Sequence, residues 1–175
     1  MELRGTRCVV RPWRPGDELA LVRHANNRNV SRQLRDRFPH PYTFSDGQRF
    51  IRTVANMAPP MIFAIVVDEP CGGIGFSPGT DVERYSAEIG YWLGEAYWGQ
   101  GIAAEALAIV SQYAFDECGI LRLFALPFAD NARSIRVLEK AGYSREGILV
   151  ASSVKYGVPR DQAMYALINP AWRRP

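Results

Sequence analysis

Apolar runs and alternating positions along the chain predict a series of short strands. Residues 61–67, Met-Ile-Phe-Ala-Ile-Val-Val, are continuously apolar and lie between Pro59-Pro60 and the turn residues Asp68-Glu69-Pro70, which is typical of a buried strand. Residues 86–93 place Ile89, Tyr91 and Leu93 on one face and the intervening residues on the other. Strands are expected at residues 7–11, 61–67, 71–76, 86–93, 121–126, 143–152 and 162–168.

Other stretches carry helical periodicity or signals of a helix end. Residues Ser45 to Gln48 match a capping box, and Gly119 and Gly142 are placed to end two later helices. Helices are expected at about 16–27, 46–57, 102–117 and 131–141, with a loop or short helices at 26–41. This order of elements predicts a single mixed α/β domain over residues 1–175.

Composition narrows the class of protein. The chain has 175 residues, of which 47% are hydrophobic and 22% charged, enough for one domain with a sizeable core. No apolar run approaches the roughly 18 residues of a membrane span, and the N-terminal residues lack the apolar segment of a secretory signal. A cytoplasmic protein without a membrane partner is therefore expected. The net charge of +3 falls short of a nucleic-acid-binding profile.

Cysteine and histidine are too few and too scattered for a structural zinc site. Cys8, Cys71 and Cys118 are far apart in the sequence, and the histidines are His24 and His40. Because no Cys-x-x-Cys pair occurs, no metal is expected, and free thiols in a reducing compartment are the simplest interpretation.

A glycine-rich stretch between a predicted strand and a predicted helix is the first candidate site. Residues 99–104 read Gly-x-Gly-x-x-Ala, which can hold the pyrophosphate of NAD or of coenzyme A at a helix N-terminus, or can be a tight turn without a ligand. A dinucleotide site also needs an acid about 20 residues further on. The first acid after the following strand is Asp130, about 30 residues after Gly99, which disfavours NAD.

Three blocks of sequence together resemble the GNAT superfamily of acyl-CoA N-acetyltransferases, and within it the ribosomal-protein alanine N-acetyltransferase-like branch. They are Glu-Ile-Gly-Tyr-Trp-Leu at 88–93, Tyr-Trp-Gly-Gln-Gly-Ile-Ala-Ala-Glu-Ala-Leu at 97–107, and Asn-Ala-Arg-Ser-Ile-Arg-Val-Leu-Glu-Lys-Ala-Gly-Tyr at 131–143. The resemblance implies about seven mostly antiparallel strands with a central splay, and about four helices. Family members are often dimers, so a homodimer is one assembly that it implies.

The resemblance also assigns the residues that would bind acetyl-CoA. The loop would hold the pyrophosphate through backbone amides, and Trp98 departs from the Gln or Arg usual at the first loop position. Backbone groups of the splayed strand would contact the pantetheine arm, with an amide near Leu93 polarising the thioester carbonyl. Asn131 is implied as a second pantetheine contact, although a plain helix N-cap is an equally good interpretation. The expected cofactor-binding residues are Tyr91, Trp92, Leu93, Gly99, Gln100, Gly101, Ile102, Ala103, Ala104 and Asn131.

Two residues are candidates for proton transfer. Glu88 is an acid inside an otherwise apolar strand, so it is either the general base for the amine or a structural acid paired with an arginine. Many family members protonate the leaving thiolate with a tyrosine at the position of Leu138, which this chain lacks. Ser134 is the implied substitute, against a role as a cap or cofactor contact.

The leading prediction is an enzyme that moves the acetyl group of acetyl-CoA to a primary amine by direct attack in a ternary complex. The alternative is a non-catalytic acyl-CoA-binding module, which would need the loop and Asn131 but neither Glu88 nor Ser134. A protein N-terminus, a peptide, an aminoglycoside or a polyamine remains open as the acceptor. It is expected to bind among the first two helices, residues 28–42 and the last two strands.

Overall fold

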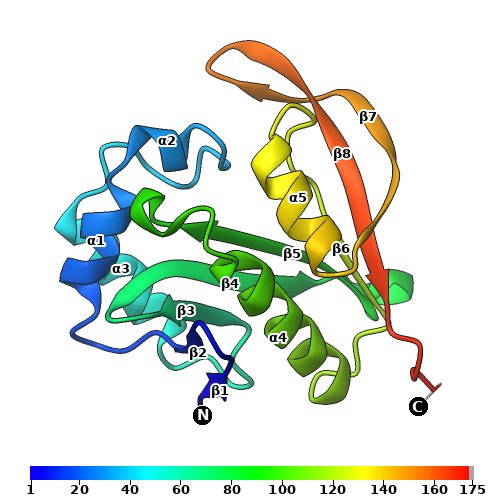
Figure 1. The fold of residues 1–175 in the computed structure, drawn as a ribbon, viewed down its shortest axis with the longest axis horizontal. Coiled ribbons are helices and arrows are strands. Elements are labelled where there is room, and N and C mark those ends of the chain that lie inside the picture. The colour runs from blue at the N-terminus through cyan, green and yellow to red at the C-terminus, as the bar shows by residue number, and fades with distance from the viewer. Residues whose placement is uncertain (174–175) are drawn as a thin grey trace.

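The computed structural model describes residues 1–173 as one eight-stranded sheet with helices packed against it (Figure 1). The helices are α1 (Glu18–Ala25), α2 (Arg28–Ser31), α3 (Phe44–Val54), α4 (Ile102–Asp116) and α5 (Ala132–Lys140), with single 3₁₀ turns η1 (Asp81–Glu83) and η2 (Glu95–Tyr97). The strands are β1 (Leu3–Arg4), β2 (Val9–Pro12), β3 (Ile62–Val66), β4 (Pro70–Pro78), β5 (Ser86–Leu93), β6 (Arg122–Ala125), β7 (Ser144–Lys155) and β8 (Val158–Ile168).

The sheet has the order β1-β2-β3-β4-β5-β6-β8-β7, and its neighbours are antiparallel except for the parallel pair β5 and β6. Strand β4 pairs with β5 from Ala87 to Leu93, whereas β6 pairs with β5 only from Ser86 to Glu88. Strands β5 and β6 therefore separate after Glu88. The expected mixed sheet with a central splay is confirmed.

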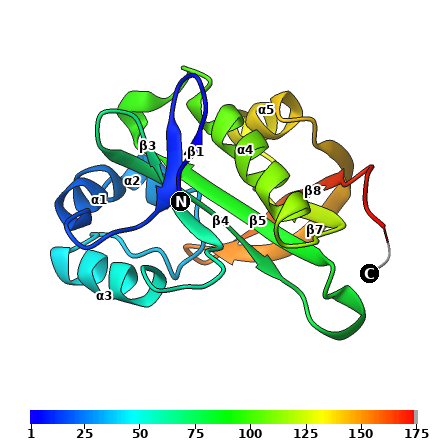
Figure 2. The same ribbon diagram turned by 90° about the horizontal axis from the view of Figure 1, so that it is seen from below.

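The two faces of the sheet bury different helices (Figure 2). Phe63 and Ile65 of β3 pack in one cluster with Leu107 and Val110 of α4, while Ala64 between them belongs to a cluster with residues of α1 and α3. Successive strand residues point to opposite faces, so α4 covers one face and α1 and α3 the other. Each fully buried aliphatic side chain contributes roughly 1.5–3 kcal/mol to this packing.

Helix α3 begins two residues before the expected start, because a different capping box is used. The Thr43 Oγ1 accepts a hydrogen bond of 3.2 Å from the Asp46 amide, and the Asp46 carboxylate accepts one of 2.9 Å from the Thr43 amide. Both Thr43–Asp46 and Ser45–Gln48 fit the sequence pattern. Thr43 takes the cap because its backbone is extended, with φ −93° and ψ 164°.

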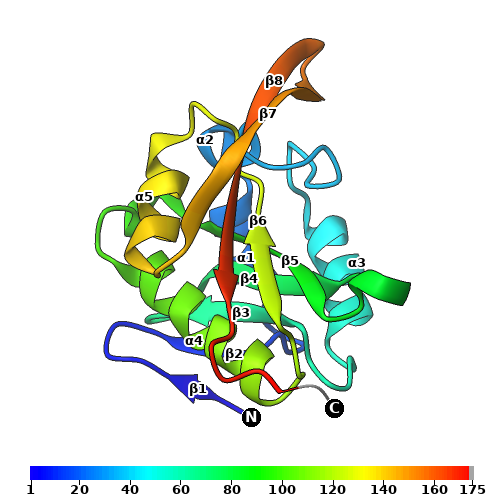
Figure 3. The same ribbon diagram turned by 90° about the vertical axis from the view of Figure 1, so that its right-hand side faces the viewer.

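The last two strands are longer than predicted and form one hairpin that projects from the body (Figure 3). Their turn is Tyr156-Gly157, with φ of 52° and 77°, as a two-residue hairpin turn of the type I′ class requires. Asn or Asp usually precedes the glycine of such a turn, so the sequence carried no clear signal there. The short edge strand β1 was also not predicted, which gives eight strands where about seven were expected.

Candidate functional site

The phosphate loop, named after its expected ligand, is residues 99–104, which follow η2 and include the first residues of helix α4. Gly99 and Gly101 have φ of 79° and 80°, in the left-handed region that glycine reaches without strain. Gly101 caps α4 without a side-chain hydrogen bond, so its first-turn amides are left for another acceptor. A helix N-terminus with uncapped amides favours an anion, and the chemistry of the loop fits a pyrophosphate.

Glu105 in the first turn of α4 fixes the phosphate loop to the turn between β1 and β2. Its carboxylate accepts hydrogen bonds from the backbone amides of Thr6 (3.0 Å), Arg7 (2.7 Å) and Cys8 (3.1 Å), and from the Thr6 hydroxyl (2.6 Å). Burial opposes its ionisation, but the bonds from Thr6 and Arg7 outweigh it and lower the pKa of Glu105 to about 2. Glu105 is thus a structural carboxylate behind the loop.

This contact brings a cation to the phosphate loop that the sequence did not suggest. A Cβ added at Gly101 would lie 3.3 Å from the Arg7 Nε, so the guanidinium lies directly beside the loop. The Arg7 side chain is 57% exposed and its Nη1 is 3.6 Å from the Glu105 carboxylate. No local pattern could have identified Arg7, because it is far from the loop in the sequence and only the fold brings the two together.

The open side of β5 exposes alternate backbone groups. The Gly94 amide donates to the Cys71 carbonyl of β4 over 2.7 Å, and strand groups alternate in direction, so Leu93 and Tyr91 direct theirs toward the splay. The same alternation turns the Trp92 backbone toward β4, so the expectation that Trp92 offers its backbone to the splay is not met. The Trp92 ring instead packs on Phe38, with ring centroids 5.5 Å apart.

Trp98 links the end of β5 to helix α5. Its indole Nε1 donates to the Leu93 carbonyl over 2.8 Å, and the Arg133 guanidinium lies 4.6 Å above its ring. Trp98, which stands where Gln or Arg is usual, therefore stabilises the start of the loop by bonding to the end of β5 and packing on α5. It also holds a second arginine near the phosphate loop. Arg133 lies within the Asn-Ala-Arg-Ser motif at residues 131–134, so its position in the sequence could have indicated a cation near the cofactor-binding residues.

Asn131 and Ser134 lie together at the start of α5. The Asn131 Oδ1 accepts a 3.2 Å hydrogen bond from the Ser134 amide, so Asn131 is the N-cap of this helix. The Tyr91 hydroxyl oxygen lies 2.8 Å from the Ser134 Oγ and 3.0 Å from the Ser134 carbonyl oxygen. Tyr91, expected to contribute only backbone, thus contributes a side chain that joins the splayed strand to α5.

Glu88 lies where β5 and β6 separate, and it forms an ion pair with Arg35. Its side chain is 34% exposed, so it is neither a buried acid nor a free one. The arginine comes from the segment after α2. The structure therefore realises the arginine pairing that the sequence left open, at a position where the carboxylate also borders the splay.

A polar cavity of about 260 Å³ lies beside this ion pair, between the segment after α2, the end of β6 and the β7–β8 hairpin. We call it the acceptor pocket, and it is lined by Gln33, Leu34, Arg35, Asp36, Leu126, Phe128, Ser152, Ser153, Val154, Lys155 and Gln162. Lys155 is only 5% exposed and donates to Asp36 over 2.7 Å. The Gln33 Oε1 is buried and has no hydrogen-bond partner within residues 1–173. Of the elements expected around the acceptor, residues 28–42 and the last two strands contribute to this lining, and the first two helices do not.

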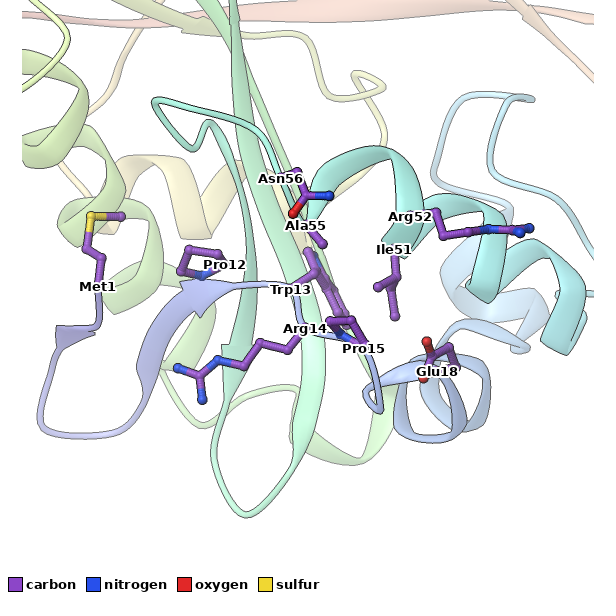
Figure 4. A pocket seen from close by; sticks show the side chains of 10 residues that line it. All are labelled: Met1, Pro12, Trp13, Arg14, Pro15, Glu18, Ile51, Arg52, Ala55 and Asn56. Atoms are coloured by element: carbon purple, nitrogen blue, oxygen red, sulfur yellow. The ribbon is translucent and has the colours of Figure 1, made fainter.

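A second hollow, of about 430 Å³, is formed by β2, α1 and α3 around Trp13 (Figure 4). None of the predicted site residues lines it. In residues 1–173 no three side chains of the metal-ligating types converge, and no described helix is long and apolar enough to cross a membrane.

Comparisons with known proteins identify the family of the chain and the fold that it shares. The family model described as "Acetyltransferase (GNAT) domain" matches residues 7–144. An uncharacterised N-acetyltransferase of Bacillus subtilis, YoaA, is 36% identical over 102 residues, which cover 58% of this chain and 57% of the relative. The ribosomal-protein-serine acetyltransferase of Escherichia coli is 37% identical over 103 residues, which cover 58% of this chain and 56% of the relative. These alignments thus span little more than half of each relative's length.

The fold is also that of solved acetyltransferase structures. The structure of RimJ from Mycobacterium smegmatis, in complex with a CoA-disulfide, superposes with a TM-score of 0.83 over 96% of this chain and 86% of that one, at 24% identity. The acetyltransferase of the GNAT family from Bacillus anthracis superposes with a TM-score of 0.83 over 96% of this chain and 98% of that one, at 23% identity. With a matching family model over most of its length and this fold, the chain belongs to the GNAT acetyltransferase family.

Proposed function

We propose that this protein is an acetyl-CoA-dependent N-acetyltransferase that acetylates a primary amine by direct attack in a ternary complex. The observation that carries the proposal is the splay between β5 and β6, which has Glu88 at its closed end and leads to Tyr91, Ser134 and the phosphate loop at its open end. With coenzyme A bound at this loop, the acyl donor and two groups capable of proton chemistry would border one opening, which supports an enzyme. A module that only binds acyl-CoA would need the donor site and neither of the two proton-transfer groups.

On the donor side, the chain's own groups suit coenzyme A. The amides at the start of α4, with Arg7 and Arg133 beside the loop, would bind the phosphates. The Leu93 amide, directed toward the splay, would donate to the thioester carbonyl as it gains negative charge. Bound acetyl-CoA supplies a thioester whose leaving group is a thiolate of pKa about 8.5. The Ser134 hydroxyl would donate a hydrogen bond and a proton to that sulfur.

On the acceptor side, Glu88 would receive a proton from the ammonium, directly or through water, and so leave a neutral amine whose lone pair attacks. The amine nitrogen forms a bond to the carbonyl carbon, the carbon–sulfur bond breaks, and its electron pair stays on sulfur. In the structure Arg35 forms an ion pair with the Glu88 carboxylate, and the Arg35 side chain is 56% exposed. An incoming ammonium can therefore exchange with it without disturbing the core.

The acceptor best supported is an α-amine at a peptide or protein N-terminus. With a pKa near 8, about a tenth of such amines are neutral at pH 7, against fewer than roughly one in a thousand lysine side chains. The acceptor pocket is lined by polar side chains such as Ser152, Ser153 and Gln162, which suit the N–H and C=O groups of a peptide. Polyamines are disfavoured because the approach carries the arginines Arg28, Arg32, Arg35 and Arg37.

The test is acetyl transfer followed by release of the free thiol, with matched amine panels. Peptides with a free Ala or Ser N-terminus should be acetylated, and the same peptides with a blocked N-terminus and an internal lysine should react far more slowly. Polyamines, aminoglycosides and free amino acids complete the panel. Coenzyme A binding without turnover on any amine would overturn the enzyme proposal and establish a binding module.

A further inference from the structure

Tyr91 connects the two elements between which the acyl donor would lie. Its side chain leaves β5 in the stretch that β6 does not cover, and its hydroxyl reaches the first turn of α5. There it lies 2.8 Å from the Ser134 Oγ and 3.0 Å from the Ser134 carbonyl oxygen. A tyrosine hydroxyl carries one hydrogen, so it cannot donate to both oxygens at once.

Counting hydrogens shows why this contact matters for Ser134. The Tyr91 and Ser134 hydroxyls each carry one hydrogen, and these two hydrogens are shared among the two hydroxyl oxygens and the Ser134 carbonyl oxygen. If Tyr91 donates to the carbonyl, the lone pair of its oxygen accepts the Ser134 hydrogen, and Ser134 points away from any ligand in the splay. If Tyr91 donates to the Ser134 Oγ, the Ser134 hydrogen is released for another acceptor. The direction of the Ser134 hydroxyl is therefore decided by Tyr91 in both arrangements.

We propose that Tyr91 is a positioning residue for acetyl transfer, donating to the Ser134 Oγ and so aiming the Ser134 hydrogen at the sulfur of the acyl donor. This inference rests on the function proposed above. Negative charge developing on sulfur favours the second arrangement, because each donor then faces an acceptor and the two hydrogen bonds polarise each other. The carbonyl of Ser134 remains within the helical hydrogen-bond pattern of α5.

Tyr91 acts through Ser134, as a neutral hydrogen-bond donor. Burial raises the pKa of Tyr91 far above its ordinary value, and the hydrogen bond with Ser134 offsets only part of that rise. Its hydroxyl therefore keeps its hydrogen throughout the working pH range. The transferred proton leaves the Ser134 Oγ, and Ser134 regains a proton from solvent once the thiol has left.

The experiment is Tyr91→Phe, which removes the hydroxyl and keeps the ring. We expect kcat to fall by about 5- to 10-fold, the scale of one hydrogen bond, while the KM for acetyl-CoA changes by less than about twofold. In a Ser134→Ala background the same change should lower kcat by less than about twofold, because the group that Tyr91 positions is absent.

A second buried tyrosine–serine pair provides the control. The Tyr143 hydroxyl lies 2.7 Å from the Ser111 Oγ, both residues are buried, and burial likewise raises the pKa of Tyr143. Tyr143→Phe should destabilise the fold about as much as Tyr91→Phe, and should leave kcat within about twofold of the wild type.

An unchanged kcat in Tyr91→Phe, or an equal loss with and without Ser134, would overturn the positioning role. A loss in Tyr143→Phe as large as in Tyr91→Phe would assign the effect to stability and overturn it as well. If the wild-type protein releases no thiol with any amine, it is the proposed function that fails, so the two failures are distinguishable.

Discussion

The phosphate loop and the acceptor pocket are built in different ways. The loop would bind its ligand through backbone amides of consecutive residues, and Glu105, whose pKa is lowered to about 2 by its hydrogen bonds, fixes the loop to the β1–β2 turn. The pocket is assembled from separate stretches of chain, whose charged side chains pair as Arg35 with Glu88 and Lys155 with Asp36. Side chains can be exchanged one at a time, whereas a backbone site depends on one local conformation.

This difference predicts which positions donor binding and acceptor choice each depend on. A backbone site tolerates most side chains except at residues with special dihedral angles, so donor binding is coupled to few positions. In the acceptor pocket the Arg35–Glu88 pair is half-exposed, so it contributes little to stability and can be rearranged by a substrate, whereas Lys155 is buried against Asp36. Donor binding and acceptor choice should therefore respond to different substitutions.

The largest effect is expected from Glu88→Gln on the acceptor side. Loss of a general base should lower kcat by roughly 100-fold and change the shape of the pH–rate profile, while coenzyme A affinity stays within about twofold. Steady-state kinetics from pH 6 to 9 and calorimetric titration measure both. An unchanged profile in shape and height would reduce Glu88 to a partner of Arg35.

The next largest effect is expected from Glu105→Gln, on stability. The charge-assisted hydrogen bonds to Thr6, Arg7 and Cys8 weaken, and the free energy of unfolding at pH 7 should fall by about 2 kcal/mol. The folded-state pKa of Glu105, about 2, lies below its unfolded value, so this stabilisation is present above about pH 4.5 and is lost as pH falls toward 2.

Urea unfolding of the wild type and the Glu105→Gln variant at several pH values measures this dependence. The difference between the two proteins should be constant from pH 7 to about 5 and shrink below that. A difference that grows on acidification would mean that Glu105 is not stabilised as an anion. The helix dipole alone would account for well under half of the effect.

A smaller effect, on donor affinity, is expected from Gly101→Ala. Both Gly101 (φ 80°) and Gly119 (φ 65°) flank α4 in the left-handed region, so an alanine at either should cost roughly 1–2 kcal/mol of stability. An added Cβ at Gly101 lies 3.3 Å from Arg7 Nε, whereas one at Gly119 meets nothing within 4 Å. Coenzyme A affinity should fall about 10-fold for Gly101→Ala and stay unchanged for Gly119→Ala, measured by calorimetry.

The smallest effect is expected from Arg7→Gln. An exposed cation near a phosphate contributes little at physiological salt, so coenzyme A affinity should fall about 3-fold, and the loss should decrease as salt is raised. Arg4→Gln is the control on the same hairpin, since Arg4 pairs with Glu2 and not with Glu105. Equal losses in the two variants would indicate a general charge effect and not a local contact at the phosphate loop.

Much of the fold could be predicted because it follows from local patterns. The apolar run of β3, the alternation in β5 and the glycines that end α4 and α5 are each readable over a few residues, and each element was found near its predicted place. The missed features are those in which local signals were ambiguous or weak. Thr43 and Ser45 both match an N-cap, and Tyr156 is an unusual residue for its turn.

The glycine-rich loop, the strand that leads to it and the family could all be predicted from sequence, because consecutive residues encode each of these features. Which side chains meet depends on the tertiary structure. Glu105 meets Thr6 across 99 residues, Lys155 meets Asp36 across 119, and Tyr91 meets Ser134 across 43. Such pairs depend on strand order and helix placement, which bring distant segments together, and the assignment of Tyr91 to Ser134 could come only from there.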